Sequence, residues 1–171
     1  NDINAQGAQL ISHMLYNKVG LTTLGLSNNM ITTGGARELA PCLEGLTKLQ
    51  KLSMESNLIG NAGCNAIAQA LKNNISLREI YLYNNELTCD GLFDLADMLV
   101  NKKQLTTLGL EYNRIRARGC NKVMESIERL PNLQRLFLNQ NQLGSDSGEA
   151  IGQLLTVNKS LKELRMSNNP V

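Results

Sequence analysis

The sequence predicts an α/β solenoid, with a parallel sheet on the concave face and helices on the convex face. Three observations support this prediction. The first is a leucine that recurs every 28 residues, at Leu21, Leu49, Leu77, Leu105, Leu133 and Leu161. The second is a strand-like alternation of apolar and polar residues after each of these leucines, and the third is a helix-like apolar stripe farther on. A fixed period of this kind is the sequence signature of stacked repeats.

The first part of each repeat predicts a short strand. Leu24 and Leu26 point to one side of the chain, whereas Thr23 and Gly25 point to the other. The same alternation returns in the later repeats. Since the strands of stacked repeats lie side by side, residues at one position of successive repeats are expected to form columns across the sheet.

The second part of each repeat predicts a helix. Its apolar stripe in the first full repeat consists of Ala36, Leu39, Ala40 and Leu43. A glycine opens the predicted helix in four repeats, at Gly35, Gly63, Gly91 and Gly119. Glycine permits close approach to the neighbouring repeat, so Ser147, which takes this position in the fifth repeat, predicts a small local adjustment.

The predicted domain organisation is a single array over residues 1–171. It consists of a partial repeat at 1–20, full repeats starting at 21, 49, 77, 105 and 133, and a partial repeat at 161–171. Helices pack about 8–10 Å apart and strands about 4.7–4.9 Å apart, so the stack should bend into a horseshoe. Because the array begins and ends inside a repeat, we expect it to be part of a longer solenoid.

An asparagine follows each predicted strand at one fixed position. The members of this column are Asn29, Asn57, Asn85, Asn113, Asn141 and Asn169. An amide side chain both donates and accepts hydrogen bonds. The column is therefore predicted to satisfy backbone groups where the chain turns out of the sheet, and a polar ladder for a ligand is the alternative interpretation.

The repeat L-x-x-L-x-L-x-x-N-x-L, followed by G-A or G-C and a helical L-A-x-x-L, resembles the ribonuclease-inhibitor class of leucine-rich repeats. The resemblance covers the whole chain. Proteins of this class include ribonuclease inhibitor, NOD-like receptors, the Ran GTPase-activating protein, and ciliary and cytoskeletal scaffolds. The constant repeat length looks more like the NOD-like receptors and scaffolds. These proteins share a shape rather than an activity, so function must be argued from the site.

Composition and motifs argue against an enzyme, a cofactor and a metal site. The formal net charge of +2 is too small to indicate nucleic acid or a membrane surface. His13 is the only histidine, so no histidine-based triad can form. The phosphate-binding glycine motif is missing as well. Asn74 and Asn158 each begin a formal glycosylation sequon, but their shared position after the helix favours a structural role.

The cysteines are predicted to be unpaired. The chain contains Cys42, Cys64, Cys89 and Cys120, with no C-x-x-C motif. Cys64 and Cys120 occupy the same helical core position two repeats apart, too distant for a disulfide. Cys42 is expected on a helix and Cys89 in a loop. Unpaired cysteines favour a reducing, cytoplasmic compartment.

Aromatic residues gather on the predicted concave face. Four of the six aromatic residues lie there or one residue beyond it: Tyr81, Tyr83, Tyr112 and Phe137. Tyr81 and Phe137 share a column with Gly109 between them, which predicts a slot one side chain wide, with Gly109 facing solvent. Exposed aromatics among charges of both signs are typical anchors of protein interfaces. The predicted partner-binding residues are Tyr81, Tyr83, Gly109, Glu111, Tyr112, Arg135 and Phe137.

A second candidate site is a basic turn after the fourth full strand, formed by Arg114, Arg116 and Arg118. It could bind a phosphate group or an acidic partner, and a solvated loop is the alternative. We therefore predict a non-catalytic, cytoplasmic protein-binding module of a receptor or scaffold. Two alternatives stay open: an activator of a Ran-type GTPase, and a purely structural spacer.

Overall fold

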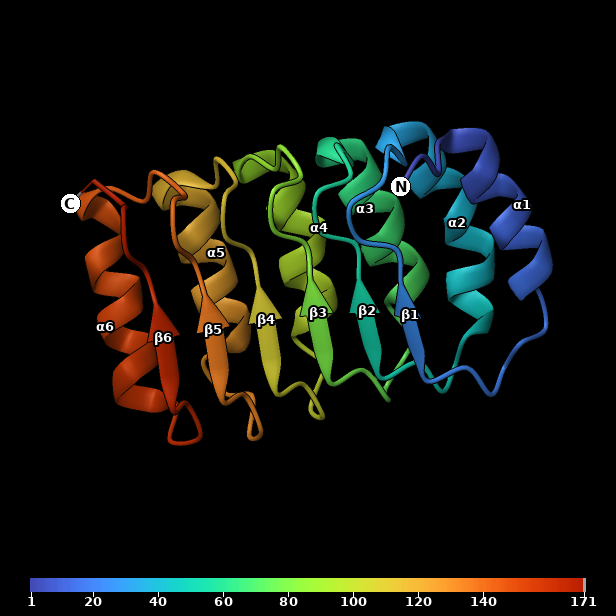
Figure 1. Ribbon diagram of the computed structural model, residues 1–171. Helices are drawn as coiled ribbons and strands as arrows, with labels where there is room; N and C mark the ends of the chain where they lie inside the picture. The colour runs from blue at the N-terminus through green and yellow to red at the C-terminus, as the bar shows by residue number, and fades with distance from the viewer. Residues whose placement is uncertain (171) are drawn as a thin grey trace.

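The computed structural model describes residues 1–170 and consists of alternating helices and short strands (Figure 1). The strands are β1 (Thr23–Gly25), β2 (Lys51–Ser53), β3 (Glu79–Tyr81), β4 (Thr107–Gly109), β5 (Arg135–Phe137) and β6 (Glu163–Arg165). The helices are α1 (Ala5–Leu15), α2 (Thr32–Gly45), α3 (Gly60–Leu71), α4 (Cys89–Leu99), α5 (Arg116–Ile127), the 3-10 helix η1 (Ser145–Ser147) and α6 (Gly148–Val157). The predicted α/β solenoid is confirmed. Val171, the last residue of the expected array, lies outside the described residues.

The strands form one parallel sheet in the order of the sequence, β1 to β6. Thr23 of β1 pairs with Lys51 of β2, which pairs with Glu79 of β3, so partners are 28 residues apart. The expected columns are therefore real rows of neighbouring side chains. The helices lie behind this sheet (Figure 1). We call the side of β1–β6 that faces away from the helices the open sheet face.

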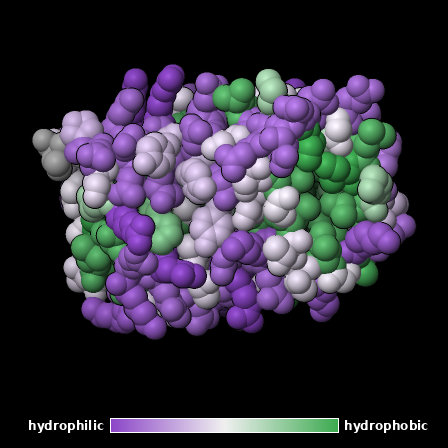
Figure 2. Space-filling model, viewed as in Figure 1, coloured by the Kyte–Doolittle hydropathy of each residue, from purple (hydrophilic) through white to green (hydrophobic). Residues whose placement is uncertain are grey.

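The core lies between the sheet and the helix layer. The central residue of each inner strand is buried, as are the stripe residues of the helices that face it, for example Leu52, Leu136 and Ile67. At the two ends of the stack this cover is thinner, because each terminal repeat has a neighbour on one side only. Leu164 of β6 and Leu21 before β1 are only partly buried, and Figure 2 shows hydrophobic surface toward both ends with polar surface between them.

Helices α2 to α5 begin two or three residues before the glycines that were expected to open them. Helix α3, for example, begins at Gly60, so Gly63 falls in its first turn. The predicted close approach is confirmed, since a Cβ atom at Gly63 would lie 2.9 Å from Ala36 Cβ of the preceding helix. At Gly119, the same atom would lie 2.9 Å from Cys89 Cα.

Ser147 produces the expected local adjustment. In place of a helix that begins directly after the turn, the fifth repeat has the short 3-10 helix η1, and α6 begins only at Gly148. Ser147 is buried, and its hydroxyl donates to the carbonyl of Gly144 at 2.8 Å. A side chain at the glycine position is thus accommodated by a delayed helix start.

The asparagine column satisfies backbone groups, as predicted. Asn85 is fully buried, and its Oδ1 accepts from the backbone N–H groups of Asn57 at 3.0 Å and Ile59 at 3.3 Å. Its Nδ2 donates to the carbonyls of Met54 at 2.9 Å and Leu82 at 3.2 Å. Each amide therefore ties its own repeat to the preceding one. The ligand-ladder alternative is wrong for Asn85 and the other amides that bond the backbone on both sides. Asn141 differs, because its buried Oδ1 accepts no hydrogen bond from the described residues.

A second buried polar column lies where the chain leaves each helix. The Nδ2 of Asn74 donates to the carbonyls of Leu46 at 3.0 Å and Leu49 at 3.2 Å, and its Oδ1 accepts from the N–H groups of Ser76 and Leu77, both at 2.9 Å. Asn158 is bonded in an equivalent way. Both amides are buried, so the sequons have the structural role that was predicted.

Lys102 takes the place of asparagine in this second column. Only 1% of it is exposed, and its Nζ donates to the carbonyls of Leu71 and Lys72 at the end of α3, both at 2.8 Å. Burial lowers the pKa of the Lys102 ammonium from 10.5 to about 8. The Lys102 ammonium group therefore caps the C-terminal end of α3, at a column position where two other repeats use an asparagine amide.

The cysteines are unpaired, and the single histidine lies at the surface. Cys42, Cys64 and Cys120 are buried on helices and Cys89 is partly exposed, and all four are free. Burial raises the pKa of the Cys64 and Cys120 thiols to about 12. Cys89 begins α4, so its expected place in a loop is wrong. His13 is exposed in the last turn of α1. The helices of residues 1–170 are all too short or too polar to span a bilayer.

The hydrogen bonds of the asparagine column predict that loss of one of these amides destabilises the fold. Asn85→Ala leaves buried N–H and carbonyl groups in two repeats without partners, which should lower the free energy of unfolding by about 1–3 kcal/mol. Urea denaturation followed by circular dichroism measures this. Asn73→Ala is the matched control, because Asn73 is exposed and its side chain forms no hydrogen bond with the residues that the structure describes. Equal midpoints for the two variants would contradict the structural role of the ladder.

Lys102 predicts a pH dependence of stability. Between pH 8 and 10.5 the unfolded chain holds the Lys102 proton more tightly than the folded chain does. The unfolded state therefore binds more protons in this window, so the contribution of Lys102 to stability rises with pH. The difference in unfolding free energy between the unmodified chain and Lys102→Met should increase from pH 8 to 10. A constant difference would show that the pKa of Lys102 is the same in the folded and unfolded states.

Candidate functional site

The open sheet face presents three columns of side chains. The first column is Thr23, Lys51, Glu79, Thr107, Arg135 and Glu163. The second is Gly25, Ser53, Tyr81, Gly109, Phe137 and Arg165, and the third, just beyond the strands, is Ser27, Glu55, Tyr83, Glu111, Asn139 and Ser167. The strands position these columns because every pairing joins residues 28 apart.

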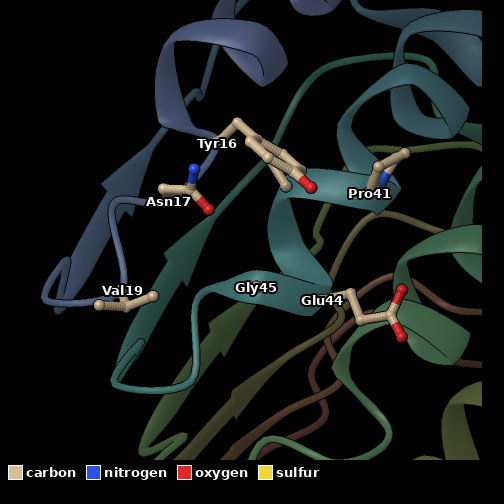
Figure 3. Close-up of a pocket in the computed structure, with 7 residues that line it drawn as sticks. Tyr16, Asn17, Val19, Pro41, Glu44 and Gly45 are labelled. Atoms are coloured by element: carbon tan, nitrogen blue, oxygen red, sulfur yellow. The ribbon is translucent and has the colours of Figure 1, made fainter.

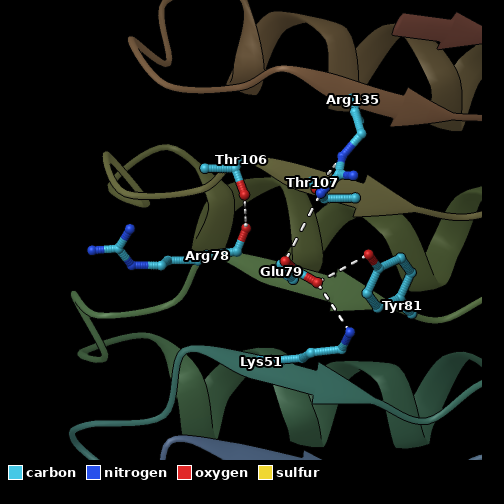
Figure 4. A network of polar contacts seen from close by, with 7 residues as sticks. All are labelled: Lys51, Arg78, Glu79, Tyr81, Thr106, Thr107 and Arg135. Atoms are coloured by element: carbon cyan, nitrogen blue, oxygen red, sulfur yellow. Dashed lines mark hydrogen bonds and ion pairs between the residues drawn. The ribbon is translucent and has the colours of Figure 1, made fainter.

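A polar network connects the first column to Tyr81 (Figure 4). The Tyr81 hydroxyl donates to Glu79 Oε2 at 3.0 Å, and Lys51 Nζ lies 3.1 Å from the same oxygen. Arg135 approaches from the other side, with Nη2 at 3.9 Å from Glu79 Oε1, and its Nε donates to Thr107 Oγ1 at 3.0 Å. The charges of this column are thus largely compensated within the chain.

The contacts of this network determine the pKa shifts of Glu79 and Tyr81. Burial by itself would raise the pKa of Glu79, but the hydrogen bonds from Lys51 and Tyr81 and the charges of Lys51 and Arg135 bring it below its ordinary value. Burial and the neighbouring Glu79 raise the pKa of the Tyr81 hydroxyl. Glu79 is therefore held as a carboxylate and Tyr81 as a neutral hydroxyl that donates to it.

The predicted slot at Gly109 is wrong. Gly109 is buried, and a Cβ atom there would lie only 2.9 Å from Tyr81 Cδ1 and 3.3 Å from Glu111 Oε2. The Tyr81 ring leans over the glycine and fills the space that was expected to be open. Glycine at this position makes room for a ring of the chain itself, so Tyr81 and Phe137 do not stand as two walls of an empty slot.

Phe137 is covered by a cation of the next repeat. The guanidinium carbon of Arg165 lies 5.0 Å from the centroid of the Phe137 ring. Arg165 Nη2 also lies 2.6 Å from Glu163 Oε1. Phe137 is only partly buried, so the ring edge and the stacked guanidinium together form the surface at this end of the face.

The third column has a different electrostatic character. Tyr83 is half-buried between the half-buried Glu55 and Glu111 of its two neighbouring repeats. Burial and then the charges of Glu55 and Glu111 raise the pKa of the Tyr83 hydroxyl. Burial raises the pKa of Glu111 as well. Among residues 1–170, neither glutamate takes part in an ion pair.

Tyr112 and Arg114 follow strand β4 and line one pocket. Tyr112 is 53% exposed, and together with Arg114 it lines a pocket of about 350 Å³ that also contains Leu58, Asn84, Glu86, Asn113, Gln140 and Gln142. Arg116 and Arg118 belong to α5, so the expectation that all three arginines lie in a turn is wrong. The Arg118 guanidinium lies 5.0 Å from the Phe93 ring centroid. The structure therefore separates the basic group and places only Arg114 beside Tyr112.

A different pocket, of about 400 Å³, lies between the end of α1 and the C-terminal half of α2 (Figure 3). It is lined by Tyr16, Asn17, Val19, Pro41, Cys42, Glu44 and Gly45. It contains none of the predicted site residues. In the part of the chain that the structure describes, there is also no cluster of three His, Cys, Asp or Glu residues that could hold a metal ion.

Sequence reasoning missed two features of this face. One is the pairing of Lys51 with Glu79, which opposite charges at one position of adjacent repeats could have indicated. The other is the position of Glu55 and Glu111 on either side of Tyr83. Comparing residues 28 apart in this column would have shown two like charges next to one tyrosine. Both signals depend on comparing a residue with its neighbours 28 residues away.

Comparisons with known proteins agree with this architecture. A sequence profile described as "Leucine Rich repeat" matches residues 45–68. Among solved structures, leiomodin-1 actin-binding site 2 is similar with a TM-score of 0.66 and 16% identity, over 87% of this chain and 86% of that one. The fold is a leucine-rich-repeat solenoid. An internalin of Listeria monocytogenes is similar with a TM-score of 0.50 and 23% identity. The alignment covers 91% of this chain and 51% of the internalin, so this chain corresponds to about half of that protein. A comparison with curated proteins found no match.

The position of the Tyr81 ring predicts different tolerance at two glycines of one column. Gly109→Leu should displace the ring and break its network, and so lower the melting temperature. Gly25→Leu is the control, because no atom lies within 4 Å of a Cβ there, and its melting temperature should stay close to that of the unmodified chain. Differential scanning calorimetry of both variants decides this. Equal melting temperatures would show that the ring does not pack on Gly109 in solution.

Proposed function

We propose that this chain is a non-catalytic protein-interaction module that binds a protein partner on its open sheet face. The observation that supports the proposal is the uncovered row of partly buried aromatic and charged side chains on β3–β5 and in the third column. The proposed contact residues are Tyr81, Tyr83, Gly109, Glu111, Tyr112, Arg135 and Phe137. Gly109 contributes by making room for Tyr81, and the other six by direct contact.

The physical basis is the exposure of groups that gain from being covered. Aromatic rings and arginine are enriched at the centres of protein interfaces, where a partner removes water from them. The Tyr81 network and the Arg165–Phe137 stack also hold these side chains in place before binding, which reduces the entropy lost on association. Among the similar structures, leiomodin-1 is named for an actin-binding site, which supports protein binding as a use of this fold.

We further propose the cytoplasm as the setting, within a receptor or scaffold of the ribonuclease-inhibitor class. The repeat phrase and the four free cysteines support this. A Ran-type GTPase activator is the main alternative, and GTP hydrolysis by such a GTPase, measured with and without the chain, tests it directly. A purely structural spacer is the other alternative, and it predicts that no sheet-face substitution changes binding.

Alanine substitution of either anchor should weaken partner binding. The chain is immobilised, partners are captured from native cell extract and identified by mass spectrometry, and the affinity of the captured partner is then measured with purified protein. Tyr81→Ala and Phe137→Ala should each cost about 2 kcal/mol of binding free energy, as interface anchors do.

The control for this experiment is Glu38→Ala, because Glu38 is exposed on α2 of the helix side. It should bind with the affinity of the unmodified chain. A partner that is retained by both sheet-face variants and lost by the helix-side variant would place the interface on the other side of the molecule.

A further inference from the structure

The open sheet face contains a place where a cation of the chain lies between a carboxylate and an aromatic ring. Lys51 Nζ lies 3.1 Å from Glu79 Oε2 and 5.1 Å from the centroid of the Tyr81 ring. The ammonium group thus gains from an opposite charge and from the electron-rich face of a ring at once.

The same arrangement occurs a second time, farther along the sheet. The Arg165 guanidinium is paired with Glu163 at 2.6 Å and stacked 5.0 Å from the Phe137 centroid. Two of the aromatic residues on this face are therefore already occupied by cations from a neighbouring repeat. The face uses one recurring combination: carboxylate, ring and cation.

A third site on this face combines two carboxylates with a tyrosine ring but has no cation of the chain beside the ring. Its members are Glu55, Tyr83 and Glu111, which occupy one column in three consecutive repeats. Backbone hydrogen bonds fix this arrangement, since Ser56 N donates to the Tyr83 carbonyl at 3.0 Å and Asn84 N donates to the Glu111 carbonyl at 2.9 Å. Tyr83 is therefore flanked by a glutamate on each side.

One oxygen of each carboxylate lacks a partner, and neither carboxylate forms an ion pair, within the described residues. Glu55 Oε2 and Glu111 Oε2 are both buried and accept no hydrogen bond from the residues that the structure describes. Burial is the largest effect on Glu111 and raises its pKa. A backbone hydrogen bond and the charge of Arg165 lower the pKa, and the charge of Glu55 raises it, with a net pKa above the ordinary value. A buried acceptor without a partner is unfavourable, so a donor with a positive charge would be stabilised here.

We propose that Glu55, Tyr83 and Glu111 bind a lysine or arginine side chain of the protein partner. This inference rests on the proposed function, because it specifies the chemistry of what the open sheet face binds. An ammonium or guanidinium group can donate to both carboxylates and lie against the tyrosine ring, as Lys51 does with Glu79 and Tyr81. Charge complementarity of this kind selects partners with a basic residue at the interface.

A divalent metal ion fits these three residues less well. Calcium takes six to eight oxygen ligands, whereas this place offers two carboxylates from repeats that are not adjacent. The aromatic ring between them suits an organic cation, because the face of the ring attracts ammonium and guanidinium groups.

The test uses a defined probe and the whole chain with ¹³C-labelled tyrosine rings. The probe is the peptide acetyl-Gly-Arg-Gly-amide, titrated at constant ionic strength and followed by NMR. The Tyr83 ring signals should shift in a saturable way with the arginine probe. They should shift at least about tenfold less with the same peptide carrying neutral citrulline, because the charge-assisted hydrogen bonds and the ring contact are both lost.

Variants of the chain sharpen the test. Glu55→Gln and Glu111→Gln keep the shape and remove the charge, so each should weaken the arginine probe several-fold at Tyr83. Glu38→Gln, on the helix side, should have no effect. Lys51→Met removes the cation beside the Tyr81 ring, and the Tyr81 ring signals should then shift with the probe. In the unmodified chain, where Lys51 occupies this position, we expect no such shift.

Several results would overturn the inference. Equal shifts of the Tyr83 ring signals with the arginine and citrulline peptides would overturn it. This comparison uses the unmodified chain, so it does not depend on whether a variant folds. A tighter response to calcium chloride than to the arginine probe would assign the place to a metal. If the probe fails while partner capture still depends on Tyr81 and Phe137, only this inference is wrong. If the probe binds but capture is independent of those two residues, the proposed function is wrong instead.

Discussion

The hydrogen bonds of the asparagine ladder are the constraint on which the rest of the structure depends. One amide, such as that of Asn85, joins N–H and carbonyl groups of two repeats at a point where strand geometry ends. The residue before each ladder asparagine has a positive φ between 54° and 58°, so the chain turns out of the sheet at the same place every time. A slip of one residue between repeats would remove every one of these bonds together with the buried leucine contacts.

The register that the ladder enforces is what gives the open sheet face its chemistry. Residues 28 apart become neighbours, so a charge in one repeat is paired or unpaired according to a residue far away in the sequence. Lys51 and Glu79 compensate each other, and Arg165 covers Phe137. Glu55 and Glu111 flank Tyr83 without such compensation, which makes that part of the face the place where an external cation gains most. The function that we propose therefore follows from the arrangement of columns rather than from any single residue.

The periodicity was sufficient to predict the fold, because spacing alone determines which residues pair, stack and face the core. It also predicted the role of the ladder amides and the adjustment at Ser147. It failed where a side chain conformation decides the outcome. Column membership placed Gly109 between Tyr81 and Phe137, but could not reveal that the Tyr81 ring rotates onto the glycine to reach Glu79. It likewise could not show that Lys102 reaches the carbonyls that end α3, since no amide pattern marks that position.

The central claim is that a protein partner lies on the open sheet face, and site-specific photo-crosslinking tests it most directly. A photoreactive amino acid is placed at Ser27 or Asn139 in the third column, or at Glu38 or Glu125 on the helix side, and each protein is irradiated in native cell extract. The account predicts one crosslinked product, shared by the two sheet-face positions and missing from the two helix-side positions. The same product formed only from the helix-side positions would contradict it.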